Sequence, residues 1–200
     1  MTAPITAYID FASPYSYFLL EPLKAEADRH GRRLVLRPIL LWAVLKEHGL
    51  TNPLETPLRR AYFMQDVVRS AAFFGKTFHP PEPLQFSAHL AARLYHAREA
   101  RRPDDSFRLA LAIYEAVYVN RQAITAPEVL AALPVLSGDD PEAVAADMQS
   151  QAGRDGLAAA VTEAAAAGVF GAPFVRIGDQ NFFGADRLPQ IAWHLQRQTG

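Results

Sequence analysis

The sequence contains no cysteine among its 200 residues. This absence excludes disulfide bonds, thiolate metal sites and redox chemistry by the protein's own sulfur. An excess of one charge is also absent: 20 basic and 21 acidic side chains leave a net charge of −1, so no nucleic-acid partner is indicated. Nor is there a signal-peptide pattern, or an apolar run of the roughly 18 residues that span a membrane. We therefore expect a cytoplasmic protein with no membrane partner.

Common catalytic and metal-binding motifs are missing as well. The chain has no glycine-rich dinucleotide or phosphate loop, no G-x-S-x-G and no H-E-x-x-H. Its six histidines are scattered, and His89 and His96, seven residues apart, could share a helix face with Arg93. Two imidazoles without a neighbouring carboxylate supply too few ligands for a typical metal site. The sequence therefore indicates no metal ion.

Both ends of the chain alternate strands with helices. A strand over 5–11, a helix over 15–30 and a strand over 34–38 form a strand–helix–strand unit, which favours parallel pairing. At the other end, strands over 174–177 and 181–183 suit a hairpin around Gly178, followed by a helix over 187–196. These patterns predict an α/β fold.

The middle of the chain shows helical patterns and hardly a strand. Turns rich in proline, glycine and aspartate separate the expected helices, which cover 59–75, 86–100, 106–120, 126–132, 141–151 and 153–167. We therefore expect two domains. One is discontinuous, made of residues 1–57 and 169–200, and the other is an all-helical insertion over 58–168.

Three short segments have unusual backbone chemistry. Ser13 and Pro14 open a helix, whose N-terminus concentrates free N–H groups and favours an anion such as a thiolate. Residues 168–174, GVFGAPF, place two glycines and Pro173 directly before a strand, and residues 182–187, FFGADR, place Asp186 at the start of the last helix. Each also has an ordinary explanation: Ser13 and Asp186 as helix caps and Pro173 as an edge-strand proline.

Taken together, these segments resemble a known family. YIDFASPYSYF near the amino end and GVFGAPFVRIGDQNFFGADRLPQI near the carboxyl end, around an all-helical middle, are similar to the 2-hydroxychromene-2-carboxylate isomerases. Those enzymes belong with the kappa-class glutathione transferases and the wider DsbA-like thioredoxin fold. The resemblance covers nearly the whole chain in element order. It implies a thioredoxin-like domain (1–57 and 169–200) split by the helical insertion.

The resemblance also implies a cofactor and a catalytic residue. Thioredoxin-like enzymes that use their own thiols carry C-x-x-C where this chain has Ser13-Pro14-Tyr15-Ser16. Glutathione would then supply the missing sulfur, with the Ser13 hydroxyl pointing at its thiolate. A serine hydroxyl suits that role as a donor, because it is a poor nucleophile without an activating base.

The same resemblance assigns residues to the tripeptide. Ala172–Pro173 would be a cis bond, with the Ala172 backbone pairing with glutathione as an added strand. Asp186, with the backbone near Ala185, would receive the γ-glutamyl amino group. Asn52 matches a polar contact position of the family. A further position is often lysine, three residues before a tyrosine, and Arg59 stands there.

These residues favour a glutathione-dependent cis–trans isomerase of an aromatic-degradation intermediate. Four aromatic side chains could line a pocket for a flat substrate: Tyr15, Trp42, Tyr62 and Phe63. Packing in the core is the commoner role of such residues. Relatives suggest a homodimer. Two alternatives stay open: a kappa-like transferase that conjugates electrophiles, and a thioredoxin-fold binding module without catalytic activity. The absence of cysteine excludes a DsbA-type oxidase.

Overall fold

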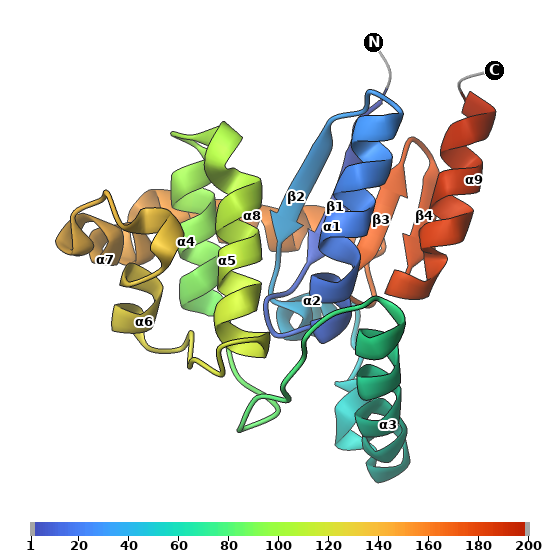
Figure 1. Cartoon of the computed structure of the whole chain (residues 1–200), viewed down its shortest axis with the longest axis horizontal. Helices are drawn as coiled ribbons and strands as arrows, with labels where there is room; N and C mark the ends of the chain where they lie inside the picture. The colour runs from blue at the N-terminus through green and yellow to red at the C-terminus, as the bar shows by residue number, and fades with distance from the viewer. Residues whose placement is uncertain (1–2, 199–200) are drawn as a thin grey trace.

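A four-stranded mixed sheet lies at the centre of the computed structural model, which describes residues 3–198 (Figure 1). Its spatial order is β2 (Leu34–Pro38), β1 (Ile5–Ile9), β3 (Phe174–Ile177), β4 (Gln180–Phe183). β1 pairs in parallel with β2 and antiparallel with β3, and β3 pairs antiparallel with β4. The first strand–helix–strand unit and the final hairpin therefore meet along β1, as a thioredoxin-like fold requires.

Helices cover both faces of this sheet. α1 (Pro14–Arg29) and α9 (Leu188–Gln198) lie in front of it in Figure 1, and α2 (Leu41–Glu47) and α8 (Gln151–Ala166) lie behind it. α1 starts with proline at its first position, where no N–H is needed for the helix. Its inner face buries Phe18, Leu19 and Leu23. This packing fixes the N-terminus of α1 beside the carboxyl end of β1.

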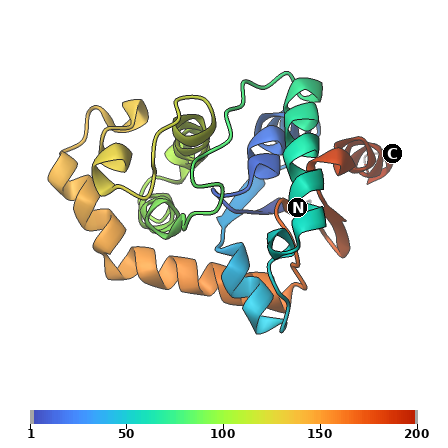
Figure 2. The same ribbon diagram turned by 90° about the horizontal axis from the view of Figure 1, so that it is seen from below.

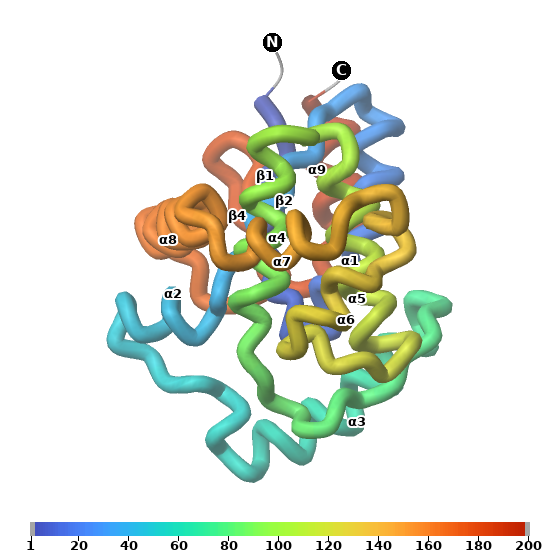
Figure 3. Tube along the Cα trace, turned by 90° about the vertical axis from the view of Figure 1, so that its left-hand side faces the viewer, coloured from blue at the N-terminus to red at the C-terminus, as the bar shows by residue number. Residues whose placement is uncertain are grey.

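The remaining helices lie beside the sheet. Figure 2 shows α8 running from the sheet toward α7, and Figure 3 shows α3 projecting at the bottom of the molecule. These helices are α3 (Pro57–Phe73), α4 (His89–Glu99), α5 (Ser106–Tyr118), α6 (Pro127–Ala131) and α7 (Pro141–Gln149). Short 3-10 turns are η1 (Pro53–Glu55), η2 (Pro103–Asp105), η3 (Pro134–Leu136) and η4 (Ala185–Arg187). One buried cluster joins sheet residues such as Ile5 to helical residues such as Ile113, so the division into two domains stays a prediction.

The structure confirms the expected fold class and corrects three boundaries. The first strand ends at Ile9 rather than at residue 11, because the chain turns after Asp10. The expected helix over 86–100 begins at His89, after the irregular segment that contains Phe86. The last helix begins at Leu188, because a 3-10 turn takes the three preceding residues.

The helix α2 was not predicted. It has seven residues, too few for a clear apolar period, and its first N–H group, that of Leu41, bonds to the distant Asp10 side chain. A contact between residues so far apart in the chain leaves no pattern in the sequence around the helix. Of the helices in residues 3–198, none combines the length and apolar character needed to cross a bilayer.

Candidate active site at the start of the first helix

A buried carboxylate fixes the loop between β1 and α1. Asp10 is 6% exposed, and its carboxylate accepts the N–H groups of Ala12 and Leu41, both at 2.8 Å. Burial raises the pKa of Asp10, and these two backbone donors oppose that rise. The Tyr114 hydroxyl donates to the Asp10 carbonyl oxygen at 3.0 Å. Asp10 therefore ties the approach to Ser13 to α2; an acidic residue directly after an apolar strand was the one sequence signal for it.

Ser13 occupies the N-cap position of α1, but its hydroxyl does not cap the helix. It donates to the carbonyl oxygen of Ala172 at 2.8 Å, across 159 positions of the chain. The positive end of the helix dipole is therefore left without neutralisation by this side chain. Such a helix start stabilises an anion. Ser16, the other serine of the motif, is fully buried and cannot contact a ligand.

The segment around Ala172 is held against the β4 turn. The Ala172–Pro173 bond is cis, which confirms what the family resemblance implied. Gly171 has no room for a side chain, since a Cβ there would overlap the Phe183 ring. The Gly184 N–H donates to the Pro173 carbonyl oxygen at 3.0 Å. Two segments singled out in the sequence thus form one rigid edge facing Ser13.

Asp186 lies on this edge, inside the 3-10 turn η4. It does not cap α9, so the expectation of a helix cap was wrong. Gly184 has φ +101°, and a Cβ there would overlap the Asp186 carboxylate. The carboxylate is 71% exposed and forms an ion pair with Arg187 at 3.3 Å. Asp186 therefore presents an accessible negative charge beside the buried Ala185.

A cavity of about 560 Å³ opens between this edge, the start of α1 and α3. Its volume falls in the range of small-molecule pockets, roughly 300–1,000 Å³. The lining residues are Tyr15, Tyr62, Asp66, Arg69, Ser70, Phe73, Phe74, Ala172, Phe183, Gly184, Ala185, Asp186 and Arg187. Ala172, Ala185 and Asp186 are thus brought together, with Ser13 bonded to the Ala172 carbonyl.

The structure does not bring the other predicted residues to this cavity wall. Asn52 caps η1, its side chain accepting the N–H of Leu54 at 2.9 Å. Arg59 is an exposed residue of α3 that does not line the cavity. Trp42 is 55% exposed on α2, and Phe63 packs on the Tyr15 ring with centroids 5.7 Å apart. Of the four aromatic candidates, only Tyr15 and Tyr62 line the cavity.

Asp66 organises one wall of the cavity, and the sequence analysis missed it. Its carboxylate accepts hydrogen bonds from Tyr15 at 2.7 Å, Ser70 at 3.3 Å, Tyr62 at 3.3 Å and Arg69 at 2.5 Å. Burial alone would raise the pKa of Asp66, but the bonds from Tyr15 and Arg69 outweigh it and lower the pKa. Burial and the same carboxylate raise the pKa of Tyr15, which stays a donor. The only sequence signal was one acidic residue between Tyr62 and Arg69 at helical spacing.

The charges of this cavity suit a small zwitterion. Arg69 and Arg187 offer cationic groups, and Asp186 offers an exposed carboxylate. The start of α1 adds a partial positive charge near Ser13. Within residues 3–198, no cluster of three or more His, Asp or Glu side chains could hold a metal ion. What the arrangement can do is bind carboxylate and amino groups at the rim and stabilise an anion at the start of α1.

Comparison with known proteins places this geometry in a family. The model of the DSBA-like thioredoxin domain matches residues 4–196. The chain is 30% identical to 2-hydroxychromene-2-carboxylate isomerase of Sphingobium xenophagum, over 98% of this chain and 99% of that one. It is 28% identical to glutathione S-transferase kappa 2 of Caenorhabditis elegans, over 92% and 88%. A solved structure of a 2-hydroxychromene-2-carboxylate isomerase superposes with a TM-score of 0.84 at 22% identity, covering 98% of this chain and 95% of that one. The chain belongs to the DSBA-like thioredoxin domain family.

Proposed function

We propose that this protein is a glutathione-dependent cis–trans isomerase acting on a conjugated, aromatic-derived substrate. One observation carries the proposal: the Ser13 hydroxyl, at the start of α1, faces the Ala172 carbonyl in a chain without cysteine. A thiolate from outside the chain would complete the site that C-x-x-C enzymes build internally. The relatives named as isomerase and as glutathione transferase support the same class.

The residues present fit the tripeptide. The Ala172 backbone and the buried Ala185 form an edge to which an extended peptide can add as a strand. The exposed Asp186 carboxylate suits the γ-glutamyl amino group, and Arg187 beside it suits a carboxylate. In the proposed function Asn52 and Arg59 would contribute from η1 and α3 only if the chain there moved toward the cavity.

Ser13 would exchange one hydrogen-bond acceptor for another. The Ala172 carbonyl now accepts the Ser13 hydroxyl at 2.8 Å. A peptide N–H pairing with Ala172 as an added strand would compete for that carbonyl and free the hydroxyl to donate to sulfur. Together with the start of α1, this donor would hold a thiol deprotonated below its ordinary pKa of about 8.5. When bound, glutathione would supply a thiolate that adds reversibly to the conjugated bond and lets it rotate.

Replacing Ser13 tests this proposal. We expect Ser13→Ala to lower kcat/KM for isomerisation of a 2-hydroxychromene-2-carboxylate by about 100-fold, the usual effect of one lost donor to a developing charge. Ser87→Ala, an exposed hydroxyl that contacts the His89 ring, is the matched control and should change nothing. Full activity in Ser13→Ala would overturn the assigned role.

A kappa-like transferase is the second candidate, favoured by the 28% identity to the kappa relative. It would use the same thiolate site and consume glutathione in each turnover. Mass spectrometry of the products separates the two activities, because a transferase adds one glutathione to an electrophile and an isomerase returns it. Calorimetry showing no glutathione binding up to millimolar concentration would instead favour a binding module.

We also propose that the protein forms a homodimer through α3. Several apolar side chains of this helix face solvent: Leu58 is 83% exposed, Phe73 80%, Tyr62 63% and Val68 54%. A patch of this kind on a helix that also lines the cavity is typical of an interface. Sedimentation velocity tests it, and a monomer at millimolar concentration would contradict it.

A further inference from the structure

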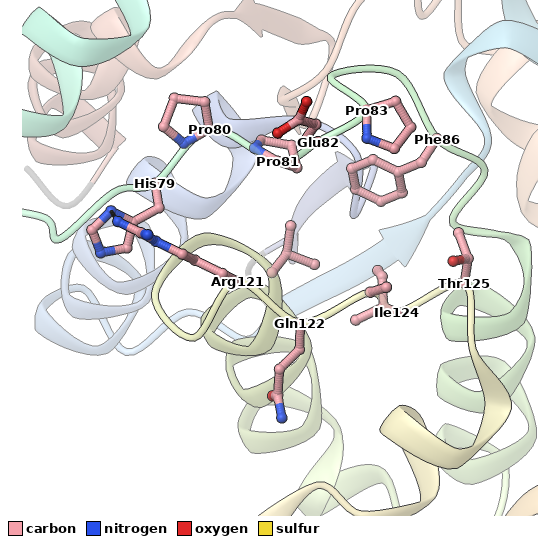
Figure 4. Close-up of a pocket in the computed structure, with 12 residues that line it drawn as sticks. His79, Pro80, Pro81, Glu82, Pro83, Phe86, Arg121, Gln122, Ile124 and Thr125 are labelled. Atoms are coloured by element: carbon pink, nitrogen blue, oxygen red, sulfur yellow. Dashed lines mark hydrogen bonds between the residues drawn. The ribbon is translucent and has the colours of Figure 1, made fainter.

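A second cavity, of about 510 Å³, lies on the helical side of the molecule (Figure 4). It is enclosed by the segment from His79 to Phe86, by Val117 near the end of α5, and by residues 121–125. No residue lines both this cavity and the one beside Ser13. Its volume again fits a small molecule. The two cavities are therefore separate sites.

Most of the wall of this cavity is apolar. The apolar lining residues are Pro80, Pro81, Pro83, Phe86, Val117, Ala123 and Ile124. Val117 is 2% exposed and Ile124 1% exposed, so they belong to the packed interior. Phe86 packs on the same core while lining the cavity. A flat apolar body would find a ring and fixed aliphatic surfaces here.

One end of the cavity carries a cation. Figure 4 shows Arg121 and His79 together, away from Phe86 and Thr125. The Arg121 Nη2 group donates to His79 Nδ1 at 3.0 Å, so the ring uses Nδ1 as an acceptor and carries its proton on Nε2. Among the ion pairs within residues 3–198, none involves Arg121, and the lining residue Glu82 is not paired with it. The remaining donors of the guanidinium are available for a carboxylate.

The backbone gives no reason for an arginine at this position. Arg121 has φ +56°, a conformation that favours glycine, and it is the only non-glycine residue at positive φ within residues 3–198. After four other helices the chain takes positive φ at a glycine: Gly31, Gly49, Gly75 and Gly168. The end of α5 departs from that pattern. Strained positions of this kind gather at functional sites, where the side chain justifies the conformation.

We propose that this cavity binds an aromatic monocarboxylate, with the carboxylate on Arg121 and the ring against Phe86, Pro83 and Ile124. The Arg121 cation at one end, with a wall that is mostly apolar apart from Glu82, Gln122 and Thr125, matches a ligand with one negative charge and a flat apolar body. The His79 contact holds the guanidinium at the cavity mouth. The proposal for this cavity does not depend on the proposed isomerase activity.

Titration of the full chain with 2-naphthoate tests the proposal, with 2-naphthamide as the uncharged probe of the same shape. We expect saturable binding of 2-naphthoate and about tenfold or more weaker binding of the amide, since a hydrogen bond to a charged partner is lost. Arg121→Asn tolerates a positive φ and removes the charge, so it should weaken 2-naphthoate about tenfold or more. The exposed Arg108→Asn, on α5, should leave the affinity unchanged.

Several results would overturn the proposal. These are no saturable binding, equal affinity for the two probes, or an affinity unchanged by Arg121→Asn. Displacement of 2-naphthoate by glutathione would show that the probe occupies the cavity beside Ser13 instead. Should Arg121→Asn fail to fold, Arg121→Gly removes the same charge at a position that glycine suits, and the same loss of affinity is expected.

Discussion

The helices α3 and α8 are of nearly equal length, 17 and 16 residues, yet they are held in opposite ways. α8 packs directly on α4 through two glycines. A Cβ at Gly156 would lie 2.6 Å from the Cβ of His96, and one at Gly153 would lie 2.8 Å from the Arg93 carbonyl oxygen. α8 is therefore fixed by close backbone approach, which leaves no room for added atoms.

α3, by contrast, buries only Val67 and Ala71 among its described side chains. Its firmest link to α1 is polar, from the Tyr15 hydroxyl to Asp66 at 2.7 Å. A helix that buries two side chains and is tied by one carboxylate has less packing to lose on a shift than one held by close backbone approach. The difference marks α8 as scaffold and α3 as the adjustable wall of the site beside Ser13.

The largest effect should follow from filling the α4–α8 contact. Gly156→Val would force its side chain into His96 and should lower the free energy of unfolding by about 2–3 kcal/mol. Ala158→Val, on the exposed face of the same helix, is the matched control and should cost below about 1 kcal/mol. Urea denaturation measures both. Equal stability of the two variants would show that α8 is not held by close packing.

A smaller loss is expected when the α3 link is cut. Asp66→Asn should lower the free energy of unfolding by about 1–2 kcal/mol, because charge-assisted bonds are lost at a carboxylate that is 21% exposed. In Asp66→Asn the KM for glutathione should rise by a larger factor than kcat falls, because Asp66 positions the α3 wall of the cavity and does not touch the reacting atoms.

A double-mutant cycle with Tyr15→Phe isolates the Tyr15–Asp66 bond. The carboxylate of Asp155 on α8, which accepts a hydrogen bond from the Gln151 side chain at 2.7 Å, provides the control Asp155→Asn. Additive effects of Asp66→Asn and Tyr15→Phe would contradict the link between α3 and α1.

The two helices should also respond to acid at different pH values. Burial lowers the pKa of His96, so the unfolded state binds its proton first, and stability at the α4–α8 contact falls as pH drops below about 6.5. The lowered pKa of Asp66 means that the α3 link is complete above about pH 4 and is lost only as pH falls further through the folded pKa.

His96→Gln keeps a donor for the Pro38 carbonyl oxygen, which His96 Nε2 contacts at 2.8 Å. The free energy of unfolding measured from pH 8 to 5 should decline less in His96→Gln than in the unchanged protein. We expect this difference to be smaller than the effects of the two preceding variants. Identical pH dependence in His96→Gln and the unchanged protein would show that His96 does not cause the loss of stability in acid.

The smallest effect should come from the exposed face of α3. The double variant Leu58→Ser, Val68→Ser should change the free energy of unfolding by about 0.5 kcal/mol or less when the chain is dilute. At high concentration it should stay monomeric if the proposed dimer uses this face. Sedimentation velocity of both proteins at matched concentrations checks this. A variant that still dimerises would show that the dimer forms through another surface.

Much of the fold could be predicted because its signals are local. Ser13-Pro14 favours a helix start through its own residue types, and the alternation of apolar segments predicted the element order. The helix α2 and the roles of Asp10 and Asp66 could not be predicted. Each depends on a partner far along the chain, such as Leu41 for Asp10 or Tyr15 for Asp66.

The candidate site divides in the same way. Ala172, Ala185 and Asp186 were found from their motifs and do line one cavity. Of the other three glutathione residues implied by the resemblance, Pro173 follows Ala172 without lining the cavity, and Asn52 and Arg59 also lie outside its wall. The positions of Asn52 and Arg59 depend on how the segment from η1 to α3 packs, which residue pattern alone does not report. The aromatic candidates Trp42, on α2, and Phe63, on α3, also lie outside the wall of this cavity.

By itself, the sequence determined that this chain has no thiol of its own and that a hydroxyl stands at the start of the first helix. Only the tertiary structure decided what that hydroxyl does. Ser13 could have capped its own helix, but packing of the Ala172–Pro173 segment brings a carbonyl oxygen within 2.8 Å. A cap depends on neighbours in the chain, whereas this bond joins residues 159 positions apart and exists only once the sheet has closed.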